Sequence, residues 1–276
     1  MYLITGAYGQ LGHSLKNILG QEGLYVDRDC LDICNLEHVD SFVGKHRPKL
    51  IINCAAYTAV DQAESDEANA FLVNATGPEN LARVAGKCGI PLIHVSTDYV
   101  FDGMSCRPYR EDDETNPQSA YGRTKLAGEV AVLKYAETAA IVRTAWLYST
   151  VGNNFVKTMQ RLGRERSSLG VVSDQIGTPT YAPDLAQALL ALAGRMTPGS
   201  RELYHFTNEG VASWYDFAVA IMELSGIDCQ VTPIRTEDYP TPAKRPAYSV
   251  LDKSKMKSLT GLAIPYWRKS LAACVD

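Results

Sequence analysis

The sequence lacks the features that mark several classes of protein. None of its apolar runs approaches the ~20 residues needed to span a bilayer. Its seven cysteines form no CxxC pair and are odd in number, and its five histidines are scattered, so neither a zinc site nor a disulfide framework is expected. No repeat or low-complexity tract occurs. The net charge of −4 gives no reason to expect nucleic acid or an anionic membrane as a partner.

What remains is the composition of an ordinary globular protein. The chain has 276 residues, of which 46% are hydrophobic and 21% charged, enough for one large domain or a domain with a small lobe. The N-terminus already reads as a strand, so no signal peptide is expected and a reducing cytoplasm is the predicted compartment. The acidic run 112–114 is interpreted as a solvated loop, and no metal site is predicted.

A glycine-rich turn follows the first apolar run. Residues 1–5 read as a buried strand, and Gly6, Gly9 and Gly12 come directly after it, followed by an amphipathic segment with helical spacing. Strand, glycine-rich turn and helix place backbone N–H groups and a helix N-terminus under a pyrophosphate. The spacing is GxxGxxG and not the commoner GxGxxG, but its position after the first strand favours a dinucleotide site.

Strands and helices alternate through the first half of the chain. Strands are expected at 50–56, 91–96 and 140–143, with a weak one at 24–26, and helices at 68–85 and 119–135. This alternation predicts an α/β fold with a doubly wound, Rossmann-like parallel sheet. After about residue 150 the pattern loosens, with a strand expected at 171–174, helices at 183–193 and 213–225, and a loop at 233–246. We therefore expect a dinucleotide-binding domain over 1–150, with 171–197 returning to it, and a smaller α/β substrate lobe mainly over 151–276.

Ligands of such sheets bind beyond the carboxyl ends of the strands. Three segments follow predicted strands there, at 6–12, 55–57 and 97–99, and should converge on one crevice. Asp27 and Arg28 follow the weak strand. A carboxylate at that place accepts hydrogen bonds from a ribose 2′-OH, whereas an arginine accommodates a 2′-phosphate, so both cofactor types are expected to bind, with a mild preference for NADPH.

Tyr121 and Lys125 lie four residues apart in a predicted helix, on the same face. An ammonium group nearby favours the phenolate and should lower the tyrosine pKa from about 10. Such a pair can exchange a proton with a substrate oxygen near neutral pH. A lone match of this kind is common by chance, and its weight comes from the nucleotide motif that accompanies it.

Together these motifs resemble a known family. The GxxGxxG turn, the Ser-Thr-Asp-Tyr-Val-Phe-Asp-Gly run at 96–103 and the Tyr121–Lys125 pair are similar to the extended short-chain dehydrogenase/reductases. Segments 9–12, 59–64, 143–148, 152–155 and 174–179, with Arg245-Pro246, resemble the dTDP-4-dehydrorhamnose reductases within it, over nearly the whole chain. The resemblance implies reduction of the 4-keto group of dTDP-4-dehydro-L-rhamnose by NADPH or NADH, giving dTDP-L-rhamnose for cell-surface polysaccharide.

The resemblance also assigns roles. Thr97 hydrogen-bonds the keto oxygen, Tyr121 gives the proton, and Lys125 lowers the tyrosine pKa and holds the nicotinamide ribose. The predicted cofactor-binding residues are Gly6, Gly9, Gln10, Leu11, Gly12, Asp27, Arg28, Asp32, Ile33, Ala55, Ala56, Tyr57, Tyr121 and Lys125. The predicted substrate-binding residues are Thr97, Asp98, Tyr99, Trp146, Asn154 and Arg245.

Some alternatives stay open. Related 4,6-dehydratases carry a glutamate after Thr-Asp, and Tyr99 stands there instead, which disfavours dehydration. Another nucleotide-sugar reductase or epimerase, or a non-catalytic regulatory relative, would share the fold. Tyr99 and Trp146 could also be packing aromatics. Some family members form a metal-bridged dimer through a glutamate just after the glycine-rich turn, and the nearest residue here is Ser14, so a metal-bridged dimer and a homodimer of another kind are both left open.

Overall fold

The computed structural model describes residues 1–275, and a parallel six-stranded sheet is its centre. The strand order is β10-β5-β4-β3-β1-β2, and every neighbouring pair is parallel. The strands are β1 (Tyr2–Thr5), β2 (Gly23–Val26), β3 (Leu50–Asn53), β4 (Leu92–Thr97), β5 (Ala139–Thr144) and β10 (Arg201–His205). The predicted α/β class with a doubly wound parallel sheet is confirmed.

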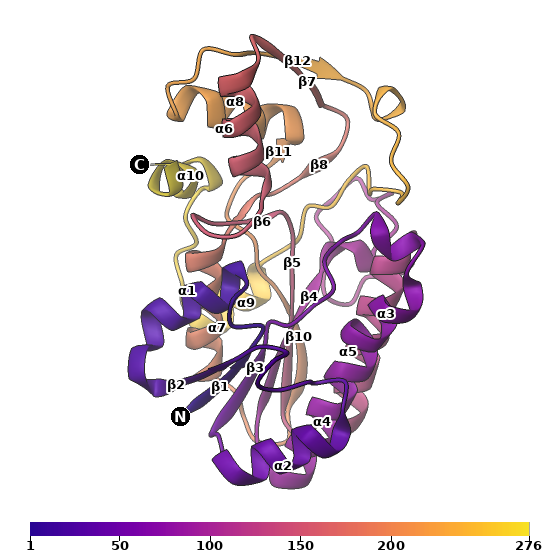
Figure 1. Cartoon of the computed structure of the whole chain (residues 1–276), viewed down its shortest axis with the longest axis vertical. Coiled ribbons are helices and arrows are strands. Elements are labelled where there is room, and N and C mark those ends of the chain that lie inside the picture. Colours follow the sequence, from indigo (N-terminus) through magenta and orange to yellow (C-terminus); the bar gives the residue numbers. More distant parts are fainter. Residues whose placement is uncertain (276) are drawn as a thin grey trace.

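Helices cover both faces of this sheet (Figure 1). On one face α2 (Leu36–His46), α4 (Gly77–Cys88) and α5 (Ala120–Tyr135) pack on a core that includes Leu3, Ile51 and Ile141. On the other, α1 (Gln10–Leu19), α7 (Ala182–Ala193) and α9 (Ser254–Thr260) pack on a core that includes Ile4 and Ile52. Because successive strand residues face opposite sides, a strand with a core on each side must be apolar throughout. That is why the apolar runs were readable as strands.

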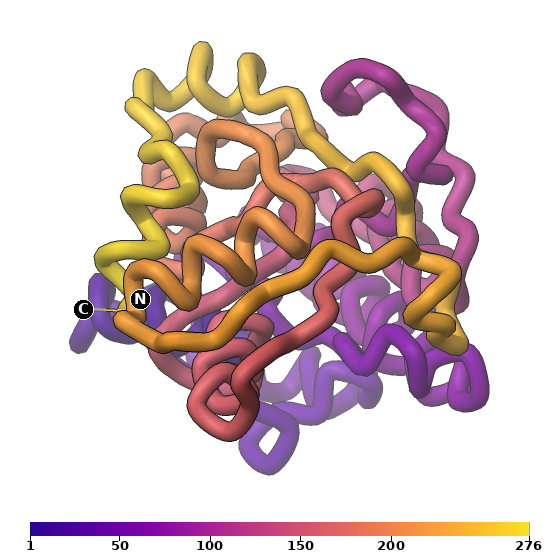
Figure 2. Tube along the Cα trace, turned by 90° about the horizontal axis from the view of Figure 1, so that it is seen from above, coloured from indigo at the N-terminus to yellow at the C-terminus, as the bar shows by residue number. Residues whose placement is uncertain are grey.

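A smaller lobe stands beyond the carboxyl ends of the strands (Figure 1). Its helices are α6 (Phe155–Glu165), α8 (Trp214–Leu224) and α10 (Trp267–Val275), which share an apolar core with Tyr148 and Phe217. Its short strands are β6 (Leu147–Tyr148), β7 (Ser168–Val172), β8 (Ile176–Gly177), β9 (Thr180–Tyr181), β11 (Ala212–Ser213) and β12 (Gln230–Ile234), which pair as β12-β7, β11-β8 and β6-β9. Seen from above, the orange chain after α8 crosses the molecule toward the purple segments of the large lobe (Figure 2).

The predicted helix over 68–85 is interrupted. It forms α3 (Glu67–Phe71), a π-helical turn (Leu72–Thr76) and α4. The turn holds Asn74, which is fully buried and whose amide bonds both backbone groups of Tyr57: Oδ1 accepts from Tyr57 N at 2.8 Å and Nδ2 donates to Tyr57 O at 3.1 Å. The π turn thus connects the helix to the segment that follows β3.

Elsewhere the chain forms more secondary structure than the sequence predicted. The loop predicted over 233–246 begins inside β12 and contains a 3₁₀ turn at Thr236–Asp238. Strand β10 and helices α2, α6, α9 and α10 were not predicted at all. Of the segment 171–197 that was expected to return to the large lobe, α7 packs on the large sheet, whereas residues 171–181 carry strands of the smaller lobe. Strand β10 and helix α9 also lie with the large sheet. The division into 1–150 and 151–276 therefore stays a prediction at the level of function.

No helix within the described residues is long and apolar enough to cross a membrane.

Candidate functional site

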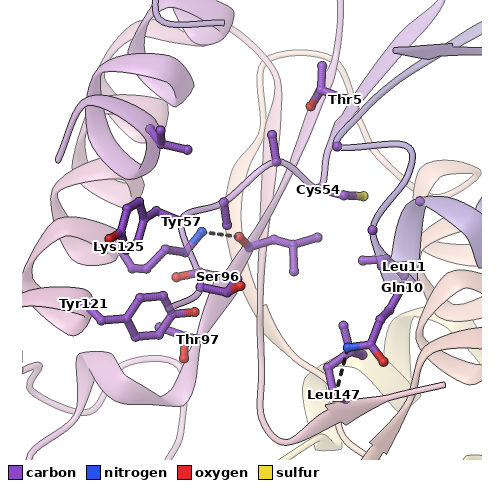
Figure 3. Close-up of a pocket in the computed structure, with 18 of the residues that line it drawn as sticks. Thr5, Gln10, Leu11, Cys54, Tyr57, Ser96, Thr97, Tyr121, Lys125 and Leu147 are labelled. Carbon is purple, nitrogen blue, oxygen red and sulfur yellow. Dashed lines mark hydrogen bonds between the residues drawn. The ribbon is translucent and has the colours of Figure 1, made fainter. Parts of the chain in front are cut away.

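A cavity of about 1330 Å³ opens between α1 and α5, at the carboxyl ends of the central strands. Figure 3 shows Gln10 and Leu11 on one side of it and Tyr121 and Lys125 on the other. Every predicted site residue except Asn154 and Arg245 lines this cavity. The cavity is also lined by residues that no sequence pattern predicted, among them Cys54, Asp66, Asn69, Thr144, Asn153 and Trp214.

The glycine-rich turn is shaped by close backbone approaches. Gly6 has φ +65, and a Cβ there would lie 2.6 Å from Ala55 N. A Cβ on Gly12 would lie 2.5 Å from the Cα of Ala7. Only glycine satisfies both restraints, so the turn brings the N-terminus of α1 to the cavity wall. The backbone N–H groups of that first helical turn are the donors that a pyrophosphate needs.

Gln10 ties this turn to the start of the smaller lobe. Its Nε2 donates to Leu147 O at 3.3 Å, and its Oε1 accepts from Ser149 Oγ at 3.1 Å and from Asn154 Nδ2 at 2.9 Å. The Asn154 Oδ1 accepts from Lys157 N and so caps the N-terminus of α6. The Asn154 amide therefore bonds other residues of the protein, and Asn154 does not line the cavity. Its contact with substrate stays a prediction.

Asp27 and Arg28 both line the cavity, but only the Asp27 side chain has hydrogen-bond partners in the protein. The Asp27 carboxylate accepts hydrogen bonds from the backbone N–H groups of Tyr8 and Arg28, at 3.3 and 2.9 Å. The Arg28 side chain is exposed and makes no hydrogen bond or ion pair with the described residues. An unpartnered guanidinium suits a phosphate, because its planar fork of donors matches phosphate oxygens. Asp32 and Ile33 line the same part of the cavity.

Helix α5 is capped twice at the end that carries Tyr121. The Ser119 hydroxyl accepts from Gly122 N at 3.1 Å, and the Glu64 carboxylate accepts from Ala120 N at 2.8 Å. Gly122 and Gly128 let the helix lie close to its neighbours, since a Cβ at either would meet a backbone oxygen, that of Tyr99 or Asn74. The caps thus set the start of the helix, and the glycines allow its close approach to the turns that hold Tyr99 and Asn74.

Tyr121 and Lys125 both point into the cavity, with Thr97 beside the tyrosine (Figure 3). Lys125 is 1% exposed, and its Nζ donates to Val95 O at 2.7 Å. Burial lowers the pKa of Lys125 to about 8, against the opposing effect of Glu129. Its ammonium group is thus desolvated and held by a backbone carbonyl at the end of β4.

The expectation that Lys125 lowers the pKa of Tyr121 is wrong for this structure. Burial raises the pKa of Tyr121 to about 12, and the Thr97 hydroxyl opposes the rise in part. The physical reason is that desolvation of the phenolate outweighs any attraction from the ammonium, which is turned toward Val95. Tyr121 therefore holds its proton firmly at neutral pH, as a general acid must before reaction.

Asp98 and Tyr99 follow Thr97 on a 3₁₀ turn (Asp98–Val100). The Tyr99 ring packs edge-on against that of Tyr121, with centroids 5.5 Å apart and planes at 77°. Burial raises the pKa of Tyr99, and that of Asp98 to about 6. Below about pH 6 both side chains are therefore uncharged, and they form the part of the cavity wall next to Thr97 and Tyr121.

Trp146 stands where β5 leaves the sheet, and it is half-buried. Its φ of +49 is rare for a bulky residue and costs on the order of 1–2 kcal/mol. Its indole stacks on that of Trp214, with centroids 3.5 Å apart and planes at 10°. Both rings line the cavity. Trp214 begins α8 directly after its N-cap, and nothing in the sequence marked it as a site residue.

Arg245 lies outside the cavity lining and pairs with Asp61. Its Nη1 and Nη2 donate to the two carboxylate oxygens at 2.8 and 2.7 Å. Ala243 N also donates to Asp61 Oδ1, at 3.1 Å. These bonds join the segment before α9 to the segment after β3, where the crossing chain of Figure 2 meets the large lobe. The predicted contact of Arg245 with substrate stays a prediction.

Comparison with known sequences agrees with this geometry. The family model described as RmlD substrate binding domain matches residues 1–276. The chain is 44% identical over 283 residues to a dTDP-4-dehydrorhamnose reductase of Aggregatibacter actinomycetemcomitans, covering 98% of this chain and 96% of the relative. It is 42% identical over 275 residues to a dTDP-4-keto-6-deoxy-D-glucose reductase of Streptomyces niveus, covering 98% and 94%.

Solved structures give the same result. A dTDP-4-dehydrorhamnose reductase of Clostridium acetobutylicum superposes with a TM-score of 0.95 at 47% identity, covering 100% of this chain and 98% of that one. One of Bacillus anthracis in complex with NADP superposes with a TM-score of 0.94 at 41% identity, covering 99% and 97%. With the family model matched over residues 1–276 and these relatives over nearly their full length, the chain belongs to the dTDP-4-dehydrorhamnose reductase family, whose members are NAD(P)H-dependent oxidoreductases.

Proposed function

We propose that this chain reduces the 4-keto group of dTDP-4-dehydro-L-rhamnose to give dTDP-L-rhamnose, using NADPH or NADH, for cell-surface polysaccharide. One observation carries the proposal: a single cavity has a dinucleotide turn in one wall and the Thr97–Tyr121–Lys125 group in the other. A reductase needs both within one space, because hydride and proton must reach the two ends of the same carbonyl.

The residues of the first wall fit a nicotinamide dinucleotide. The glycines that leave no room for a Cβ bring the α1 N-terminus to the cavity, which suits a pyrophosphate. The unpartnered guanidinium of Arg28 suits a 2′-phosphate, while the Asp27 carboxylate already accepts two backbone N–H groups. These contacts favour NADPH over NADH. When bound, the reduced nicotinamide supplies a hydride.

The residues of the second wall manage the proton. Tyr121 is the proposed acid, because its raised pKa keeps it protonated and its hydroxyl points into the cavity. Thr97 is the proposed donor to the keto oxygen, where a hydroxyl stabilises the charge that develops during reduction. Lys125, charged and nearly unexposed, is proposed to hold ribose hydroxyls.

The smaller lobe is proposed to select the sugar nucleotide. Trp146 and Trp214 present an aromatic surface to the cavity, suited to stacking on a base or a sugar ring. Asp98 and Tyr99 would shape the sugar end. A nucleotide sugar is therefore the proposed partner, in a cytoplasmic enzyme, and a homodimer is a further proposal that light scattering on the purified protein would test.

A second candidate, reduction of another dTDP-4-keto sugar, is favoured by the similarity to the Streptomyces niveus enzyme. Steady-state assays with purified protein separate the possibilities. dTDP-4-dehydro-L-rhamnose should oxidise NADPH with the highest kcat/KM, and the product should be dTDP-L-rhamnose. A higher kcat/KM with dTDP-4-keto-6-deoxy-D-glucose would support the second candidate. Interconversion of UDP-sugars without net NADPH oxidation would indicate an epimerase, and no turnover of any substrate would indicate a regulatory relative.

A further inference from the structure

Asp98 is a buried carboxyl group in the wall that carries Thr97. It is 2% exposed, and its Oδ1 accepts a hydrogen bond from the Thr97 hydroxyl at 3.0 Å. The Thr97 oxygen in turn accepts from Tyr99 N at 3.2 Å. A hydroxyl has one hydrogen to give. While Asp98 is a carboxylate, the hydrogen of Thr97 is therefore directed at Asp98 and away from the cavity.

This arrangement conflicts with the role proposed for Thr97. To donate to a keto oxygen, Thr97 must release its hydrogen from Asp98 while it keeps the bond from Tyr99 N. A carboxylic acid at position 98 solves the problem, because its own O–H can donate to the second lone pair of the Thr97 oxygen. The hydrogen of Thr97 is then free to point into the cavity.

We propose that Asp98 acts in its neutral form as a positioning residue that donates a hydrogen bond to Thr97 and so directs the Thr97 hydrogen to the substrate's keto oxygen. The proposal rests on the proposed function. Asp98 keeps its proton throughout, no bond to it forms or breaks, and the proton consumed in the reduction comes from Tyr121.

The surroundings of Asp98 favour the neutral acid. The Oδ2 atom is fully buried and makes no hydrogen bond within the described residues, and the Ser249 hydroxyl only partly offsets this loss. A buried acceptor without a partner is far more costly on a carboxylate than on an acid. Burial accordingly raises the pKa of Asp98 to about 6, although the Ser249 and Thr97 hydroxyls favour the charged form.

Titratable and charged neighbours reach this corner from several elements. Tyr99 lies on the same turn, and Tyr121 faces it from α5. Asp61 and Arg245, which pair with each other, act on the pKa of Tyr99 in opposite directions. A bound dinucleotide and sugar nucleotide would exclude water and add negative charge, and both effects raise the pKa of a carboxyl further. The neutral form would then extend toward neutral pH in the working complex.

The pH dependence of kcat/KM tests the proposal. Because the pKa of Asp98 is raised, its neutral form is present below about pH 6 and is lost as the pH rises through that value. Wild-type kcat/KM should fall about tenfold per pH unit above this point. Asp98→Asn carries a permanent N–H donor and should be active with a flat profile between about pH 5.5 and 8. Ser249→Ala removes a group that favours the charge, so its falling limb should move to higher pH.

Two results would overturn the proposal: the same falling limb in Asp98→Asn as in the wild type, or a wild-type profile with no such limb. A titration without substrate distinguishes these from a failure of the proposed function. The carboxyl infrared band of Asp98, identified by its loss in Asp98→Asn, should show an acid that ionises at or above about pH 6. Ionisation near the usual value of about 4 would reject the neutral form whatever the enzyme's substrate.

Discussion

Tyr121 and its neighbours show how burial sets chemistry at the scale of one residue. The same loss of water raises the pKa of the Tyr121 phenol to about 12 and lowers the pKa of the Lys125 ammonium to about 8. Each group is thereby pushed toward its neutral form, and the acid that reaches the keto oxygen is an intact phenol. The spacing of the pair was readable from the sequence, but the direction of the tyrosine shift was not, because it depends on burial.

Tyr121→Phe should lower kcat by on the order of 10²–10⁴, the usual share of general acid catalysis. Binding of NADPH, followed by fluorescence titration, should persist because only one hydroxyl is removed. Tyr135→Phe is the matched control, since Tyr135 ends the same helix and packs against Arg83, away from the cavity. Turnover within twofold of the wild type, roughly, in Tyr121→Phe would remove the tyrosine from the proton-donor role.

Arg28→Ala should reduce the preference for NADPH. The lost guanidinium would have made charge-assisted hydrogen bonds to a 2′-phosphate, each worth roughly 1.5–3 kcal/mol. We expect kcat/KM for NADPH to fall by about tenfold or more and kcat/KM for NADH to change little. Arg166→Ala, an equal loss of charge at an exposed site after α6, is the control. A wild-type preference for NADH above about tenfold would instead assign the choice to Asp27.

At the scale of elements, the π turn at Leu72–Thr76 connects the cavity wall to helix α5. Besides bonding Tyr57, the Asn74 amide donates to Thr124 Oγ1 at 3.2 Å, and that hydroxyl donates to Tyr121 O at 2.9 Å. Asn74 thus joins the segment after β3 to the turn of α5 between Tyr121 and Lys125. Such turns occur disproportionately at functional sites.

Asn74→Ala should destabilise the fold by on the order of 1–3 kcal/mol, because the backbone N–H and C=O of Tyr57 lose their partners inside the protein. Urea unfolding measures this loss. Asn69→Ala is the control, since Asn69 is exposed and bonds only Asp66 through its side chain. Equal midpoints for the two variants would show that the Asn74 bonds do not hold this wall in place.

Elements differed in how well the sequence predicted them, for physical reasons. Strands β1, β3, β4 and β5 are buried on both faces and therefore appear as apolar runs. Strand β10 is an edge strand that begins with exposed Arg201 and Glu202, so its pattern is weak. The break at Asn74 depends on a contact with Tyr57, which no local pattern encodes. Asn154 resembled a ligand group in sequence, yet an asparagine before a helix is also an ordinary N-cap.

The whole molecule places its cavity between two lobes that are joined at several points. Gln10 bonds the chain around 147–154, Arg245 pairs with Asp61, and the stacked indoles link the end of β5 to α8. The Asp61–Arg245 pair is partly exposed, so it contributes at most about 1 kcal/mol and serves mainly to fix geometry. Selection of the sugar nucleotide is expected at the stacked pair.

Trp146→Ala should weaken substrate use by roughly 1–3 kcal/mol in kcat/KM, about the value of a lost aromatic stack. NADPH affinity should change little. A fully buried tryptophan would instead lose about 3–5 kcal/mol of stability through the cavity left behind. A strongly lowered Tm with unchanged KM would therefore assign Trp146 to packing, and Trp267→Ala, at a buried tryptophan away from the cavity, supplies the reference for that outcome.

The most direct test of the account follows the hydride itself. Purified protein would be given dTDP-4-dehydro-L-rhamnose and NADPH carrying deuterium at the transferable position of the nicotinamide, and the sugar would be examined by mass spectrometry and NMR. The account predicts dTDP-L-rhamnose with one deuterium, located on C4. NADPH oxidation without deuterium in the sugar, deuterium on another carbon, or no reaction with this substrate would contradict it.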